Sequence, residues 1–266
     1  MNPRPTTKAF PLDPVLASLR LERPRSVDVA WLAEAFRAWT RVVPFTNLGK
    51  LKAIRAGEPL PSLDPGCMME RFLEDGSCGT CFSHALAFRA LLCSVGYDAR
   101  IYAGHTTGED GVRGEHATTL VMLGRDTWLV DTALPHGKPL QLFRDRPARI
   151  ENVMTPMTAS PAGDLWKLDF ILLHNNTQRQ AVLTEELRDT AHAMQCWVRT
   201  LEEADSPFNK VPVARLESEL GFLTLAGNKL FVFEYEHGIR VEPAGPETLA
   251  RFGIEPTSYA GLWSTF

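Results

Sequence analysis

The chain has 266 residues, of which 44% are hydrophobic and 23% are charged, and this is the composition of an ordinary globular protein. Its formal net charge is −4 and it has no long run of one sign, so we expect neither a nucleic acid nor a membrane surface as a partner. No apolar stretch approaches the roughly 18 residues that cross a bilayer, and the first residues lack the apolar segment of a signal peptide. Because the five cysteines are sparse and odd in number, a reducing compartment is favoured, and we expect a cytoplasmic protein.

Apolar residues at helical spacing dominate the first third of the chain. They predict helices over residues 27–40, 64–76 and 81–96. Ser26 and Asp64 are the expected N-caps of the first two helices.

From residue 97 onwards the pattern changes to short strands. Alternation and turn residues predict strands over 99–103, 116–123, 127–132 and 169–173 and a meander over 222–241, with a polar Gly-rich loop over 104–114. Residues 178–204 have helical spacing and predict one long helix, and Pro246 is expected to open a closing helix. Helices first, strands second and a mixed tail predict an α+β protein in about three parts.

Three residues suggest covalent chemistry. Cys81 lies where a loop becomes a helix, and the free N–H groups and positive dipole end of a helix N-terminus favour thiolates. His116 begins a strand and Asp131 lies near the end of the next, so antiparallel pairing brings them together. An imidazole takes a thiol proton and a carboxylate fixes the imidazole tautomer, so the three predict acyl transfer through Cys81. Taken singly, each is also compatible with a structural role, such as an inert buried cysteine.

Cys78 and Cys81 form a C-x-x-C pair, which raises two other possibilities. A thioredoxin-like redox motif should follow a strand, whereas the segment before Cys78 has helical spacing. A zinc site needs two more ligands, and Cys93 and His84 fall on the same expected helix as Cys81. We therefore expect no metal.

Several segments resemble the arylamine N-acetyltransferase family. Val43-Pro44-Phe45-Thr46-Asn47-Leu48 resembles its I-P-F-E-N-L segment, and Gly79-Thr80-Cys81-Phe82 resembles the end of its R-G-G-x-C-F motif. Leu129-Val130-Asp131 resembles its L-V-D, while Ser206-Pro207-Phe208 and Leu223-Thr224-Leu225 resemble its S-P-x-S-x-F and later T-L segments. The matches span nearly the whole chain in the right order.

The resemblance implies a fold and a reaction. It implies a helical domain over residues 1–96, a β-barrel over 97–177, an interdomain helix over 178–205 and an α/β lid over 206–266, with a transglutaminase/papain-like Cys-His-Asp core. It implies a ping-pong reaction in which acetyl-CoA acylates Cys81 and a small-molecule amine takes the acyl group, with no permanently bound cofactor. His116 is then the base and Asp131 the orienting acid. The implied substrate contacts are Phe45, Leu134 and Phe208.

The chain departs from the family pattern at two places. Where the family has D-V-G-F-G, this chain has Asp131-Thr132-Ala133-Leu134-Pro135, which lacks two glycines that let the backbone approach CoA. An acyl chain on a carrier protein is therefore an alternative donor to acyl-CoA. Three charged residues that look like one ionic network in the family are Ser18, Thr46 and Ser77 here, which suggests coordinated replacement.

Two other function classes stay open. The same thioester would form in a Cys-His-Asp amide or thioester hydrolase, with water finishing the reaction. A binding protein that keeps the scaffold without catalysis is the other possibility. His105, His136 and His237 lie in expected loops or turns and are expected to face solvent.

Overall fold

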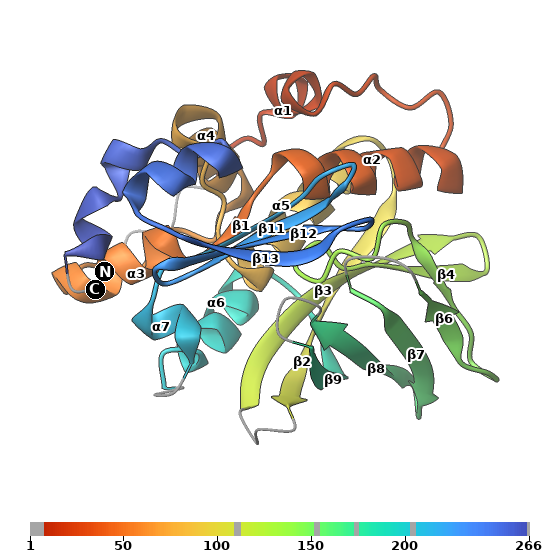
Figure 1. Cartoon of the computed structure of the whole chain (residues 1–266). Helices are drawn as coiled ribbons and strands as arrows, with labels where there is room; N and C mark the ends of the chain where they lie inside the picture. The colour runs from red at the N-terminus through yellow and green to blue at the C-terminus, as the bar shows by residue number, and fades with distance from the viewer. Residues whose placement is uncertain (1–7, 109–112, 152–154, 173–175, 203–205, 265–266) are drawn as a thin grey trace.

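The computed structural model describes residues 8–108, 113–151, 155–172, 176–202 and 206–264 of the chain. Figure 1 shows helices α1, α2 and α4 at the top and strands β2, β3 and β6 to β9 at the bottom, with strands β11 to β13 running beneath α2. The helices are α1 (Leu12–Leu19), α2 (Val29–Val42), α3 (Leu48–Ala56), α4 (Pro65–Asp75), α5 (Cys81–Ser94), α6 (Thr190–Arg199) and α7 (Pro207–Lys210).

Helix α5 is the centre of the helical part. It is buried along most of its length, and the α2 side chains Phe36 and Trp39 pack on its Phe88 with ring centroids 6.2 and 5.1 Å away. Asp64 caps α4 by accepting the N–H of Cys67, as expected. Within the described ranges, every helix falls short of the length and apolarity that a bilayer crossing requires.

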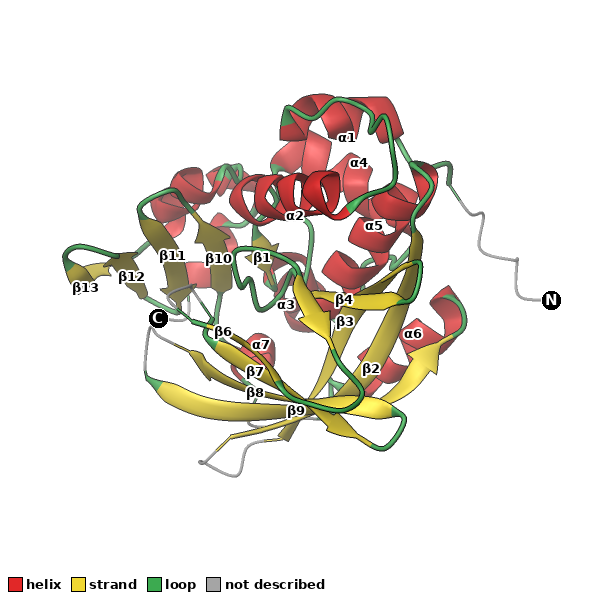
Figure 2. Ribbon diagram, turned by 90° about the vertical axis from the view of Figure 1, so that its right-hand side faces the viewer, coloured by secondary structure: helices red, strands yellow, loops and turns green. Residues whose placement is uncertain are grey.

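Eight antiparallel strands form a curled sheet. They are β2 (Asp98–Gly108), β3 (Arg113–Leu123), β4 (Asp126–Val130), β5 (Leu140–Leu142), β6 (Ala148–Ile150), β7 (Met157–Ala162), β8 (Leu165–Leu172) and β9 (Thr177–Leu187). Their order is β5-β4-β3-β2-β9-β8-β7-β6, and the two edge strands contact each other, so the sheet nearly closes into a barrel (Figure 2). Inward residues such as Leu120, Leu168 and Leu183 fill it.

The C-terminal part of the chain contributes four strands to a second sheet of five strands. It has the order β1-β10-β11-β12-β13, with β1 (Phe45–Thr46), β10 (Val213–Glu217), β11 (Gly221–Ala226), β12 (Lys229–Glu234) and β13 (Gly238–Pro243). One face packs Leu225 and Val232 against Leu51 of α3 and against the closing 3-10 helices, the first of which is Pro246–Phe252. The other face, which includes Arg215 and Thr224, is turned toward the barrel.

The prediction of one long helix over residues 178–204 is wrong for the first half of that segment. Residues 177–187 form strand β9, which pairs with both β2 and β8, and the helix α6 begins only after its N-cap Asp189. The inward residues Ala181, Leu183 and Leu187 satisfy a period of two and also helical spacing at i and i+4, so the apolar pattern alone misled the prediction.

Other boundaries also differ from expectation. The polar loop expected over 104–114 is mostly strand, because β2 and β3 pair as far as Thr107 with Arg113, and residues 109–112 lie outside the described residues. Asp28, and not Ser26, caps α2 by accepting the N–H of Trp31. The closing helix at Pro246 is a 3-10 helix.

Two helix-ending glycines provide a test of how the C-terminal segment docks. Gly57 and Gly76 both have a left-handed backbone conformation, with φ of 65° and 82°. A Cβ on Gly76 would lie 2.0 Å from the Gly253 oxygen, whereas a Cβ on Gly57 would meet nothing within 4 Å. We expect Gly57→Ala to lower the free energy of unfolding by about 1 kcal/mol. Gly76→Ala should cost several times more, because the Gly253 backbone must also move. Urea unfolding measures both, and equal losses would contradict this packing.

Candidate active site

Cys81 is the first residue of α5, and its position depends on the turn before it. The N-cap Thr80 is extended, and Gly79 has φ +148°, at which a Cβ would lie 2.3 Å from Ser83 Oγ. Glycine is therefore needed for the chain to enter the helix at this angle. The Cys81 sulfur is partly exposed and lies 3.9 Å from the backbone oxygen of Glu115.

His116 and Asp131 form a buried pair beside this sulfur. His116 Nε2 lies 2.7 Å from Asp131 Oδ2, and the two residues are 4% and 0% exposed. Burial by itself disfavours the imidazolium, but the Asp131 carboxylate and the Cys81 side chain together raise the pKa of His116 to about 10. Because Asp131 occupies Nε2, the other ring nitrogen, Nδ1, remains for the thiol.

Both oxygens of the Asp131 carboxylate have hydrogen-bond partners. While Oδ2 faces His116, Oδ1 accepts the backbone N–H of Ala133 at 3.1 Å and of Leu134 at 2.9 Å. Burial opposes ionisation, but His116, and after it His136 and the Leu134 N–H, lower the pKa of Asp131. The same carboxylate therefore fixes the imidazole and shapes the turn that follows the strand.

A cavity of about 390 Å³ opens at Cys81 and His116 between the second sheet and the barrel. Its apolar wall contains Phe45, Leu134 and Phe208, the three residues expected to contact substrate. The Phe45 and Phe208 rings meet edge-on with centroids 5.6 Å apart. The other lining residues include Lys50, Thr80, Thr106, Glu115, Ala133, Phe170, Arg179, Thr200, Val213, Arg215, Thr224 and Phe231.

The chain matches a known protein family. A family model described as N-acetyltransferase matches residues 28–245, which is most of the chain. The chain belongs to the N-acetyltransferase family. The resemblance noted in the sequence is thus confirmed, and the expected enzyme class is the class of this family.

Two solved structures of arylamine N-acetyltransferases have the fold of this N-acetyltransferase. The Mycobacterium smegmatis protein superposes with a TM-score of 0.77 at 20% identity and covers 96% of each chain. The Bacillus cereus protein, described as having a Cys-His-Glu catalytic triad, superposes with a TM-score of 0.76 at 18% identity over 92% of this chain and 98% of its own. The expected α+β fold with its barrel is confirmed by these likenesses.

A curated relative matches part of the sequence. Proansamycin X synthase of Amycolatopsis mediterranei (strain S699) is 30% identical over 112 residues, which are 41% of this chain. The match spans 42% of that protein's own length.

His136, expected to face solvent, is fully buried in this N-acetyltransferase. Its Nε2 accepts the Asp131 N–H at 3.2 Å, and its ring lies 4.9 Å from that of Phe36. Burial lowers the pKa of His136 to about 4, so the ring is neutral at neutral pH. It is a support for Asp131 that sequence reasoning missed, because nothing local marks a loop histidine as buried.

His84 is a second buried support, on α5. Its Nδ1 accepts the Trp39 indole N–H at 3.1 Å, and its Nε2 donates to the Pro44 oxygen at 3.1 Å. Both ring nitrogens are thus occupied, and burial lowers the pKa of His84 to about 4. This link places Phe45, the residue after Pro44, beside the N-terminal part of α5.

Thr46 and Ser77, two of the three hydroxyl residues that the resemblance aligns with charged residues of the family, bond to different parts of the chain. Thr46 Oγ1 donates to the Val213 oxygen at 3.0 Å, whereas Ser77 Oγ donates to Asp75 at 2.6 Å and lies 2.8 Å from the Tyr259 hydroxyl. Thr46 thus joins β1 to β10, while Ser77 joins the end of α4 to the C-terminal segment.

Cys78 is buried three residues before Cys81. It is 1% exposed, and burial raises the pKa of its thiol to about 12. Both cysteines are free in the structure. A thiol that stays protonated and enclosed is a poor nucleophile, so Cys81 is the more reactive position of the C-x-x-C pair.

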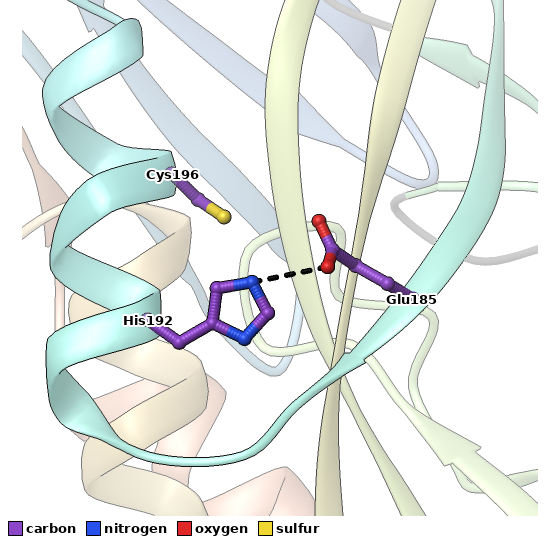
Figure 3. A group of neighbouring side chains, drawn as sticks. All are labelled: Glu185, His192 and Cys196. Atoms are coloured by element: carbon purple, nitrogen blue, oxygen red, sulfur yellow. Dashed lines mark ion pairs between the residues drawn. The ribbon is translucent and has the colours of Figure 1, made fainter.

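Glu185, His192 and Cys196 form a separate group of side chains (Figure 3). Their donor atoms lie within 4.8 Å of one another, with His192 Nε2 at 3.0 Å from a Glu185 oxygen. However, an Arg199 guanidinium nitrogen lies 3.2 Å from the Cys196 sulfur. A fixed positive charge there disfavours a metal cation, so the group is better described as an ion pair beside a buried thiol.

The His116–Asp131 pair predicts a pH dependence of stability. The pKa of His116 is raised from 6.5 to about 10 in the folded chain, so its contribution to stability is complete below pH 6.5 and is lost as the pH rises toward 10. Asp131→Asn removes the carboxylate that raises this pKa. Urea unfolding between pH 6.5 and pH 10 should show a steeper decline for the wild type than for Asp131→Asn or His116→Gln. Identical slopes in all three proteins would refute the coupling.

Proposed function

We propose that this chain is an N-acyltransferase in which Cys81 takes an acyl group from a thioester and passes it to an amine. The observation that carries the proposal is the buried contact of 2.7 Å between His116 and Asp131, beside a cavity that His116 and Cys81 both line. This is the arrangement that nucleophilic catalysis by cysteine needs. The described triad of the Bacillus cereus relative supports it, with Asp131 as the acid here.

The proposed reaction has two half-steps. In the first, His116 already holds the Cys81 thiol proton as an imidazolium, with Nδ1 facing the sulfur. The Cys81 sulfur attacks the donor carbonyl, and the donor thiol leaves with that proton. In the second, the amine nitrogen attacks acyl-Cys81 and gives its proton to His116, and the Cys81 sulfur leaves and regains it. Backbone N–H groups at the start of α5 are the proposed donors to the oxyanion of each tetrahedral intermediate.

The proposed acceptor is a small aromatic amine. The rings of Phe45 and Phe208 and the side chain of Leu134 form an apolar wall beside Cys81, which suits an aromatic ring. The family to which the chain belongs supports amine acylation.

The proposed donor is acetyl-CoA, with a carrier-bound acyl chain as the alternative. The N–H groups of Ala133 and Leu134 already bond to Asp131, so the turn after the acid does not offer them to a phosphate. One relative is named a synthase, which supports testing acyl groups other than acetyl. Five free cysteines support a reducing, cytoplasmic setting.

Intact-mass spectrometry tests the nucleophile. After brief exposure to acetyl-CoA the wild type should gain one acetyl group, and Cys81→Ala should gain none, because Cys81 is the thiol that lines the cavity beside His116. Cys93→Ala, which removes an exposed cysteine, is the matched control and should be acetylated like the wild type.

The fate of the adduct separates transfer from hydrolysis. We expect acetyl-Cys81 to persist in buffer and to be discharged by an arylamine, with the amide as product. Rapid loss to water without an amine would instead indicate a hydrolase. If Cys81 alkylates readily but takes no acetyl group, acetyl-CoA is not the donor, and a carrier-bound thioester should be tried.

A further inference from the structure

Two polar side chains lie side by side on the cavity face of the second sheet. Arg215 on β10 and Thr224 on β11 are direct partners in the antiparallel register, so their side chains point to the same face. Both line the cavity that Cys81 and His116 also line. They are almost completely enclosed, since Arg215 is 9% and Thr224 is 2% exposed.

Neither side chain has a full set of partners. Arg215 donates one hydrogen bond, from Nη1 to the Ala133 oxygen at 3.2 Å, while its Nε and the Thr224 hydroxyl are buried without any partner. Within the part of the chain that the structure describes, no carboxylate pairs with this guanidinium. Asp131 faces His116, and Glu217, two residues along β10, bonds instead to Thr40 at 2.5 Å.

A buried cation and hydroxyl left in this state are costly. Burying an unpaired charge or hydroxyl loses hydration without replacing it, and an anion that accepts from both restores those bonds. Burial and the nearby Arg179 lower the pKa of Arg215 to about 10, which leaves it charged at neutral pH. Lys50 and Arg179 line the same cavity, and its one acidic lining residue, Glu115, already contacts Arg199 and His105.

We propose that Arg215 and Thr224 form a subsite for a carboxylate group of the substrate. The guanidinium Nε–H and the threonine hydroxyl would each donate to it, and a hydrogen bond between a guanidinium and a carboxylate is charge-assisted and therefore stronger than a neutral one. This inference rests on the proposed function, because it deepens the choice of substrate at the same site.

The packing places the subsite next to the reacting atoms. The Arg215 guanidinium lies 5.3 Å from the centroid of the Phe45 ring and bonds to Ala133. Cys81 packs against the small cluster that contains both Phe45 and Ala133. The pose that we propose for an aminobenzoate has its ring against Phe45, its amine at Cys81 and its carboxylate at Arg215, all of which line one cavity. A terminal carboxylate on the acyl group is the second source of the same chemistry.

The experiment compares matched substrates with a donor that has no phosphate. With p-nitrophenyl acetate as donor, the ratio of kcat/KM for 4-aminobenzoate over neutral 4-aminobenzamide measures carboxylate preference on the amine. We expect the wild type to prefer 4-aminobenzoate. Arg215→Met should lower the ratio by about tenfold or more, and Thr224→Val by a smaller factor, since each removes a donor to the carboxylate.

A second arm tests the acyl group. Succinyl-CoA and butyryl-CoA, with the neutral amine 4-methylaniline, replace the amine pair. A preference for succinyl-CoA that falls in the same variants would place the carboxylate on the acyl group, and a preference in the first arm alone would place it on the amine.

Thr224→Val keeps the test independent of folding. Because the Thr224 hydroxyl has no partner, its removal should not lower the melting temperature. Thr158→Val on β7 and Arg240→Met on the exposed strand β13 lie outside the cavity lining and serve as matched controls with wild-type ratios.

Direct binding separates failure of this inference from failure of the proposed function. Benzoate, and not benzamide, should raise the melting temperature of the wild type, and this shift should shrink in Thr224→Val even if Cys81 is never acylated. Unchanged ratios in both arms for folded Arg215→Met and Thr224→Val would overturn the subsite. So would a loss confined to acylation by acetyl-CoA, which would assign the two residues to CoA phosphates.

Discussion

The buried carboxylate of Asp131 is the constraint on which the rest of the site depends. One oxygen holds the His116 imidazole, and the other holds the backbone of the turn formed by Ala133 and Leu134. A carboxylate without solvent is tolerated only when its acceptor sites are filled, so the strand end, the turn and the imidazole must take their positions together. The cavity wall that follows is a consequence of this arrangement.

Three separate parts of the fold meet at that constraint. Cys81 is the first residue of helix α5. His116 lies in barrel strand β3, and Asp131 directly follows strand β4. The second sheet contributes Arg215 to the cavity wall. The sheet is tied to the first part through β1, whose Thr46 bonds to the Val213 backbone. A cavity assembled from parts so distant in sequence needs each interface to be well packed, which the separate buried clusters provide.

Features encoded by neighbouring residues could be predicted from the sequence, whereas features that depend on tertiary contacts were missed. Gly79 before Cys81, the cap at Asp64 and the hairpin that joins His116 to Asp131 are all encoded within a few residues, so sequence reasoning could place them. The prediction for the segment that forms strand β9 was wrong because its apolar spacing fits both a helix and a strand. Only the pairing with β2 and β8 decides between the two. The lack of a partner for Arg215 is a property of its surroundings, which no single segment contains.

The three buried histidines have very different pKa values, because their surroundings differ. His84 and His136 are enclosed as fully as His116, yet burial lowers the pKa of both to about 4, whereas that of His116 is raised to about 10. What differs is the direct contact of His116 with the Asp131 carboxylate, to which the Cys81 side chain adds. The same carboxylate reaches the second sheet, since Ala133 donates its N–H to Asp131 and accepts from Arg215 with its oxygen. A ligand at the proposed Arg215 subsite would therefore bind a side chain that is hydrogen-bonded to the turn after Asp131, so the Ala133 peptide would connect substrate binding to the orientation of His116.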